Sequence, residues 1–160
     1  MLAAVRRLRG LRREIDQLDT DIDRVLAARH TQHLQAICGV GALVAAKLLG
    51  EVQHIERFAT PAAFAVHAGT APVPASSGTH RRHRLNRGGN RQLNRALFTV
   101  ARTQARWHPP ARDYLARKRA EGKTAAEARR CLMRHLATAV WKAMRADAQV
   151  AEASPTPTPT

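Results

Sequence analysis

The strongest chemical signal in this sequence is a run of arginines and asparagines near its middle. Residues 79–106 hold eight arginines and no aspartate or glutamate, whereas an ordinary solvated basic face mixes both signs of charge. The planar guanidinium of arginine makes paired hydrogen bonds to phosphates, and the asparagine amide suits contacts to base edges. The cluster therefore predicts a nucleic-acid interface made by Arg81, Arg82, Arg84, Asn86, Arg87, Asn90, Arg91, Asn94 and Arg95.

A second anion-binding signal is the turn Gly39-Val40-Gly41, which lies between two expected helices. Glycines let backbone N–H groups at a helix start approach a phosphate closely, as in helix-hairpin-helix DNA-binding elements. Lys47 in the second helix adds a positive charge. A plain structural turn explains the same residues, but in a chain of net charge +15 we favour phosphate binding by Gly39, Gly41 and Lys47.

Ser76-Ser77-Gly78 is the candidate for covalent chemistry. A serine attacks a phosphodiester when it is held in line and cations stabilise the developing charge. By itself, however, this tripeptide is typical of a turn. No general base or metal-binding carboxylate clusters with it, because the acids between residues 51 and 127 are Glu51, Glu56, Asp113, Glu121 and Glu127. The residues alone therefore predict binding and no reaction.

The overall composition narrows the class of partner. A net charge of +15 and an isoelectric point near 11.7 indicate a polyanion or an anionic membrane surface. The longest apolar stretch, residues 36–50, is too short and glycine-interrupted to span a bilayer. The arginine cluster begins in a Gly/Pro-rich loop and not on an amphipathic helix. We therefore expect a cytoplasmic protein that binds nucleic acid and no membrane.

Metal chemistry has no support within the chain. Cys38 and Cys131 are each flanked by apolar residues, lack ligand spacing, and are typical of reduced core cysteines. The eight histidines have no H-x-x-x-H companion. We predict no metal site and no cofactor in this chain.

Periodicity and capping residues predict an all-α fold that positions these groups. A capping box, Thr124-x-x-Glu127, opens the last helix, and Thr60-Pro61 opens an earlier one that closes at Gly69. Residues 70–89 form a long loop that carries the serines and the start of the basic cluster. The helices are expected to end near Ala36, to run from Ala42 to about Leu49, from Asn90 to Trp107, through Tyr114 to Gly122, and onward from Thr124.

The N-terminal segment predicts a coiled-coil-like helix. Apolar residues alternate at spacings of three and four over about three heptads, at Leu8, Leu11, Ile15, Leu18, Ile22 and Val25. The seam fits either packing on its own domain or pairing with a second helix. We divide the chain into a linker helix (1–30), a compact helical DNA-binding domain with a helix-hairpin-helix-like element (31–147) and a disordered tail (148–160).

The chain also resembles a known family over about residues 34–146. The collinear segments are Gly39-Val-Gly-Ala, Ala46-Lys-Leu-Leu, residues 64–97, His108-Pro-Pro-Ala-Arg-Asp-Tyr-Leu and Glu121-Gly-Lys-Thr-Ala-Ala-Glu. They look like the C-terminal domain of the IS one-ten family of bacterial insertion-sequence transposases, described as bridge-RNA-guided recombinases. The resemblance implies DNA as substrate, a structured guide RNA as partner, and Ser77, the serine before the glycine, as the nucleophile.

In that family the active site is composite. An N-terminal acidic domain binds divalent metal, expected to be Mg²⁺, and the coil that joins the domains helps to assemble the oligomer. This sequence begins inside what resembles the coil, so we expect the acidic domain to be missing and the chain to bind without cutting alone. Homo-oligomers or an acidic partner would then use the N-terminal helix. The alternative is an architectural or regulatory nucleic-acid-binding protein without catalysis.

Overall fold

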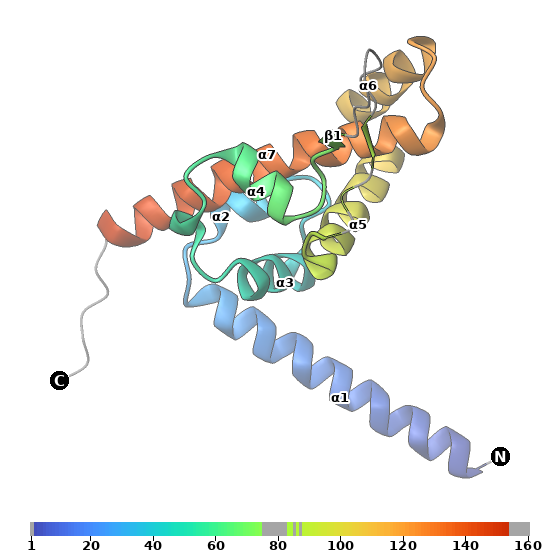
Figure 1. The fold of residues 1–160 in the computed structure, drawn as a ribbon. Coiled ribbons are helices and arrows are strands. Elements are labelled where there is room, and N and C mark those ends of the chain that lie inside the picture. The colour runs from blue at the N-terminus through green and yellow to red at the C-terminus, as the bar shows by residue number, and fades with distance from the viewer. Residues whose placement is uncertain (1, 75–82, 85, 87, 154–160) are drawn as a thin grey trace.

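The computed structural model describes residues 2–74, 83, 84, 86 and 88–153, and over these the chain is all-α, as the sequence predicts. A single 3-10 turn, η1 (Ile55–Arg57), lies between α3 and α4. The helices are α1 (Leu2–Ala27), α2 (Gln32–Gln35), α3 (Ala42–Val52), α4 (Pro61–His67), α5 (Arg91–Trp107), α6 (Pro109–Ala120) and α7 (Ala125–Ala153) (Figure 1).

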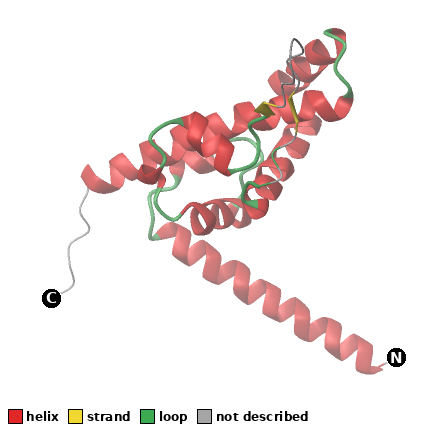
Figure 2. Cartoon of the chain, viewed as in Figure 1, coloured by secondary structure: helices red, strands yellow, loops and turns green. Residues whose placement is uncertain are grey.

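Two features differ from the sequence prediction. The loop between α4 and α5 contains a small antiparallel ladder, β1 (Val73–Pro74) with β2 (His83–Arg84), in which Val73 lies opposite Arg84 (Figure 2). Strands this short carry no alternating pattern that a sequence could reveal. The last helix also continues beyond the expected boundary at 147 to Ala153, because residues 148–153 favour helix and the proline repeat begins only afterwards.

Helix α7 is the central helix of the fold. It packs against α2, η1, α4, α5 and α6, so most of the core forms along its length (Figure 1). Fully buried side chains from these elements meet there, including Leu34, Phe64, Leu97 and Val140. The surfaces of α5 and α6 that face away from the core are therefore held rigidly.

Side-chain caps fix where the helices begin. Thr60 accepts a hydrogen bond from Ala63 N (3.1 Å) at the start of α4. At the start of α7, Thr124 N donates to Glu127 Oε2 (2.9 Å) and Glu127 N donates to Thr124 Oγ1 (3.3 Å). This reciprocal pair is the predicted capping box, and it is confirmed.

The first short helix of the core is capped from the last one. Asp147 on α7 is buried, and its carboxylate accepts hydrogen bonds from His33 N (2.9 Å) and Leu34 N (3.0 Å). The His33 ring also contacts Asp147 through Nδ1 (2.8 Å). A carboxylate suits this place because the N–H groups at a helix start are unpaired and carry partial positive charge.

Helix α1 projects away from this core, as Figure 1 shows. Its C-terminal end packs on the body, with Leu26 buried and Ile22 partly buried against the core. The rest of the apolar seam is exposed, at Leu8, Leu11, Ile15, Leu18 and Val25. Among the described residues, no helix has the length and apolar character needed to cross a membrane.

Candidate nucleic-acid interface

The two ends of the loop that carries the serines meet where Gly69 lies against Gly89. Asn90 N donates to His67 O (2.6 Å), which joins the returning chain to the end of α4. Gly69 adopts a φ of +66°, a conformation that favours glycine. A Cβ on Gly89 would collide with the backbone N and Cα of Gly69. Glycine is therefore required at both sides of this contact.

Three asparagines of the predicted cluster reinforce the same junction. Asn86 Nδ2 donates to Val66 O (2.9 Å), and Asn94 Nδ2 donates to Ala68 O (3.0 Å). Asn90 caps α5, where its Oδ1 accepts from Gln92 N (2.9 Å) and its Nδ2 donates to Glu51 Oε2 (2.8 Å). These amides, which the sequence suggested for base contacts, are engaged in holding the fold.

Among the described side chains of the cluster, two arginines face solvent. Arg91 and Arg95 are exposed one turn apart on α5, as the spacing predicts. Arg84 lies in β2, where its backbone alone is described. The remaining predicted members of the cluster and both serines lie outside the described residues: Ser76, Ser77, Arg81, Arg82 and Arg87.

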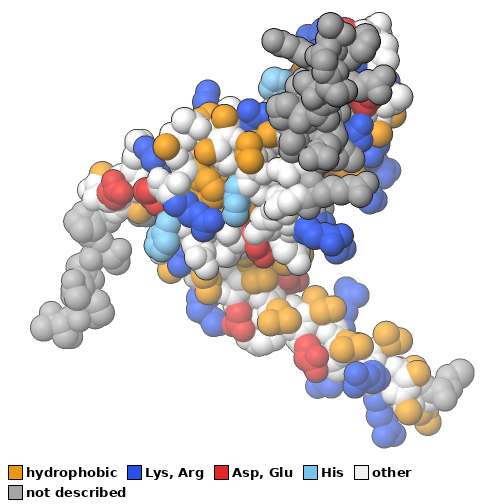
Figure 3. Space-filling view, in the orientation of Figure 1, with side chains coloured by type: hydrophobic (Ala, Val, Ile, Leu, Met, Phe, Trp, Pro, Cys, Tyr) orange, Lys and Arg blue, Asp and Glu red, His pale blue; other side chains and the backbone are white. Residues whose placement is uncertain are grey.

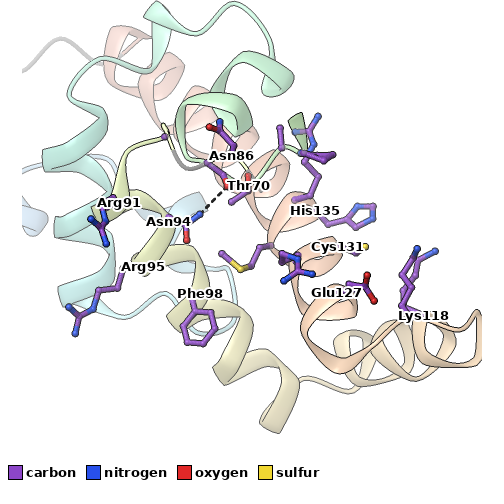
Figure 4. Close-up of a pocket in the computed structure, with 18 of the residues that line it drawn as sticks. Thr70, Asn86, Arg91, Asn94, Arg95, Phe98, Lys118, Glu127, Cys131 and His135 are labelled. Atoms are coloured by element: carbon purple, nitrogen blue, oxygen red, sulfur yellow. Dashed lines mark hydrogen bonds between the residues drawn. The ribbon is translucent and has the colours of Figure 1, made fainter. Parts of the chain in front are cut away.

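A cleft of about 1130 Å³ opens between the loop ends, α5, α6 and α7 (Figure 4). We call it the basic cleft. Residues 69–72 contribute to its wall from one end of the loop, and Asn86 and Gly89 contribute from the other. Six cations line it: Arg91, Arg95, Lys118, Lys123, Arg130 and Arg134.

The electrostatics of the basic cleft are strongly one-sided. Glu127 is the acid among its lining residues, and that carboxylate is engaged by Thr124 in the capping box. Lys118 pairs with Glu121 (2.7 Å), and this hydrogen bond raises the pKa of Lys118. Of the described acids, none pairs with Arg91, Arg95, Lys123 or Arg130. These four cations are therefore available to phosphates.

Sequence reasoning missed the α6 and α7 side of this cleft. The cations on this side come from a segment in which basic and acidic residues alternate: Lys118, Lys123, Arg130 and Arg134. This segment therefore lacks the acid-free run of arginines that identified residues 79–106 as a nucleic-acid interface. Tyr114 also lines the cleft, and burial raises the pKa of its phenol, with a further contribution from nearby Cys131. Tyr114 is thus a neutral hydrogen-bond donor and stacking surface at physiological pH.

The glycine turn lies at the opposite end of α5 from this cleft. Gly39 has a φ of +89° and packs against Thr103 and the Val100 carbonyl, and buried Gln104 donates to Cys38 O (2.8 Å). Since Arg91 precedes Thr103 by twelve residues along the helix, the two predicted phosphate sites are about 18 Å apart. The structure does not join them into one site.

Within the turn, the two glycines differ in what they do. The conformation of Gly39 is one that the fold demands, whereas Gly41 is exposed with open space around its Cα, directly before α3. Lys47 is half-buried in the second turn of α3. Phosphate binding by Gly41 and Lys47 stays a prediction, as does the helix-hairpin-helix-like reading of α2 and α3.

Comparison with known proteins places this geometry in context. A family model described as Transposase IS116/IS110/IS902 family matches residues 31–116. A 43.6 kDa protein of insertion element IS110 from Streptomyces coelicolor is 42% identical over 114 residues, which is 69% of this chain and 28% of that protein.

Two further relatives extend the match. A 44.8 kDa protein of insertion element IS116 from Streptomyces clavuligerus is 30% identical across 91% of this chain and 35% of its own length. A 42 kDa protein of insertion element IS900 from Mycobacterium paratuberculosis is 31% identical across 84% of this chain and 36% of its own length. The chain thus spans about a third of each curated relative.

The glycine contact yields a stability prediction. Gly89→Ala should lower the free energy of unfolding by about 1–3 kcal/mol, because the added methyl meets backbone that cannot move aside. Gly88→Ala is the matched control, since its Cβ would approach nothing nearer than Asn86 Oδ1 at 3.6 Å. Urea unfolding followed by circular dichroism measures both. Equal stability of the two variants would contradict the proposed junction.

The exposed arginines yield a binding prediction. Replacing both Arg91 and Arg95 by alanine should reduce the salt dependence of duplex DNA binding, with the slope of log K against log salt falling in magnitude by about 2. Arg112→Ala, an exposed α6 arginine outside the cleft, should leave the slope unchanged. Fluorescence anisotropy titrations at several salt concentrations provide the measurement. An unchanged slope in the double variant would remove these residues from the interface.

Proposed function

Because this chain belongs to the IS116/IS110/IS902 transposase family, we propose that it is the DNA-binding, serine-bearing part of an insertion-sequence transposase. One observation carries the proposal: both ends of the loop that contains Ser76 and Ser77 line a cleft rich in unpaired cations. A nucleophile on that loop would act on DNA that the cleft's arginines and lysines hold by its phosphates.

The proposed reaction is a phosphoryl transfer to Ser77. Its Oγ bonds to phosphorus as the bond from phosphorus to the leaving sugar oxygen breaks, and the serine proton passes to a base while the sugar oxygen gains one. Arg91 and Arg95 supply positive charge for the developing negative charge on the phosphate. Rejoining reverses these steps with a different strand end, which gives recombination without loss of bond energy.

A divalent metal does not fit the described residues. No group of three or more His, Cys, Asp or Glu side chains gathers anywhere in them, and the acid lining the cleft, Glu127, is held by Thr124. If the reaction uses Mg²⁺, its ligands must come from other residues or from an acidic partner domain. The role that we propose for this chain is therefore to bind the DNA, to orient the reacting phosphodiester and to supply the attacking serine.

The proposed partners are DNA and a structured guide RNA. Both present a phosphate backbone, which the four cleft cations that no described acid pairs with would bind. No helix in the described part of the chain could span a membrane. Sequence choice would then rest on base pairing with the guide, because the asparagine amides of this region are committed to the fold.

Helix α1 is the proposed assembly element, and its charge distribution favours an antiparallel pair with a second copy. Five arginines occupy residues 6–13 and five acids occupy residues 14–23, so the two ends of the projecting helix carry opposite charge (Figure 3). With Leu8 and Leu11 at positions a and d, antiparallel pairing stacks Leu8 on Leu18 of the second copy and Leu11 on Ile15 of the second copy.

Residues flanking the seam distinguish the two orientations. A parallel pair would place Arg7 beside Arg12 of the second copy, and Glu14 beside Asp19 of the second copy, so both of these flanking contacts would be repulsive. The antiparallel pair instead places Arg7 beside Asp21 of the second copy on both sides of the dimer. Like charges meet only at its centre.

Assembly through α1 can be tested by a charge reversal that weakens an antiparallel dimer and strengthens a parallel one. Arg7→Asp should weaken self-association by about three- to tenfold, because two attractive pairs become repulsive, and adding Asp21→Arg should restore it. Sedimentation equilibrium measures the dimer constant. If the pair were parallel, Arg7→Asp would strengthen it. A chain that stays monomeric throughout would leave an acidic partner domain as the occupant of α1.

The nucleophile has a direct test. With an acidic domain from a relative and a suitable guide RNA supplied, wild-type protein should form covalent adducts with labelled DNA, Ser77→Ala should abolish them, and Ser76→Ala should retain most of them. Denaturing electrophoresis detects the adducts, and folded protein is checked by circular dichroism. Adducts undiminished in Ser77→Ala would refute the assignment. DNA binding without adducts in any protein would favour an architectural role.

A further inference from the structure

An exposed aromatic ring stands in the wall of the basic cleft. Phe98 is on the same face of α5 as Arg91 and Arg95, three residues beyond Arg95, and 38% of it is exposed (Figure 4). The guanidinium of Arg129 lies 5.5 Å from the centre of its ring. Phe98 contributes to no part of the buried core. An exposed aromatic ring between cations is a surface on which a nucleotide base can stack.

The opposite wall repeats the combination of ring and cation. Tyr114 on α6 lies beside His135, with ring centres 5.0 Å apart, and both line the cleft. Lys118 lies 5.7 Å from the centre of the Tyr114 ring. Aromatic rings interleaved with cations are the arrangement by which proteins hold unpaired nucleotides, with bases stacked on the rings and phosphates on the charges.

Duplex DNA does not fit this combination. Its bases are stacked on one another, so it offers a protein only base edges, sugars and phosphates. A ring facing a duplex would meet charged backbone and would lose hydration without gaining a stacking partner. The cleft, at about 1130 Å³, is just above the usual range of about 300–1,000 Å³ for concave small-ligand sites, which suits a few nucleotides.

We propose that the basic cleft takes unpaired nucleotides, with Phe98 as the stacking platform for a base. This rests on the proposed function, and it identifies the form of nucleic acid that the site holds. The phosphates on either side of the stacked base lie against Arg91, Arg95 and Arg130. The single strand is DNA opened near the reacting phosphate or an unpaired stretch of RNA, since both present the same stacking face.

The test compares single strands with duplex on the full chain. Fluorescence anisotropy uses a labelled DNA strand of about 12 nucleotides, an RNA strand of the same sequence, and the DNA strand as a duplex. Phe98→Ala should weaken single-strand binding about tenfold and duplex binding less than about twofold. Phe98→Tyr, which keeps the ring, should bind as wild type does. The preferred sugar shows which strand is the natural occupant.

The chain offers a matched control in Trp107. It is a more exposed aromatic on the same helix, lies outside the cleft, and also has an arginine over its ring, Arg106 at 4.9 Å. Trp107→Ala should change single-strand binding less than about twofold. Circular dichroism checks that each variant is folded. The salt slope should stay unchanged in Phe98→Ala, because no phosphate contact is lost.

The possible failures are separable. If Phe98→Ala binds single strands as wild type does, or weakens duplex and single strands equally, the stacking proposal is overturned while DNA binding stands. An equal effect of Trp107→Ala overturns it as well. If wild-type protein binds neither duplex nor single strands, both this inference and the proposed function fail. Wild-type capture of an acidic protein in place of nucleic acid would also overturn it.

Discussion

The close approach of Gly69 to Gly89 is the constraint on which the rest of the interface depends. It makes the chain leave α4 and re-enter α5 at the same point, so the two ends of the intervening segment meet at one place on the surface. Asn86, Asn90 and Asn94 secure the junction through bonds to backbone and to Glu51. Since α5 packs on α6 and α7, the ends of the loop, Arg91 and Arg95 are held against the second wall of the cleft.

Local signals predicted the helices well because local interactions set their ends. Thr60, Asn90 and Thr124 cap helices within three residues of themselves, and such caps are visible in sequence. The asparagines show where this reasoning stops. Their place among arginines suggested base contacts for Asn86 and Asn94, but their partners are carbonyls 20 to 26 residues away. Only the folded chain shows that these amides are occupied.

The basic cleft is a tertiary feature for the same reason. One wall came from the acid-free arginine cluster and was predicted, whereas the other comes from α6 and α7, where charges of both signs alternate along the sequence. In the folded chain, Lys123 and Arg130 line the cleft, whereas the carboxylate of Glu127 is held by Thr124 in the capping box of α7. Helix α7 lies beyond the residues matched by the family model, yet it completes both the core and the basic cleft.

The bond from Asp147 to the start of α2 joins positions 113 and 114 residues apart, and this ordering has a consequence for synthesis. A ribosome releases the chain from its N-terminus, so α2 to α6 emerge before the helix against which most of them pack. The arginine-rich segment is therefore exposed early, before the opposite wall of the cleft has been synthesised. A nascent chain without α7 carries part of the positive charge of the basic cleft but lacks its second wall, so we expect the cleft to form only after α7 has been synthesised.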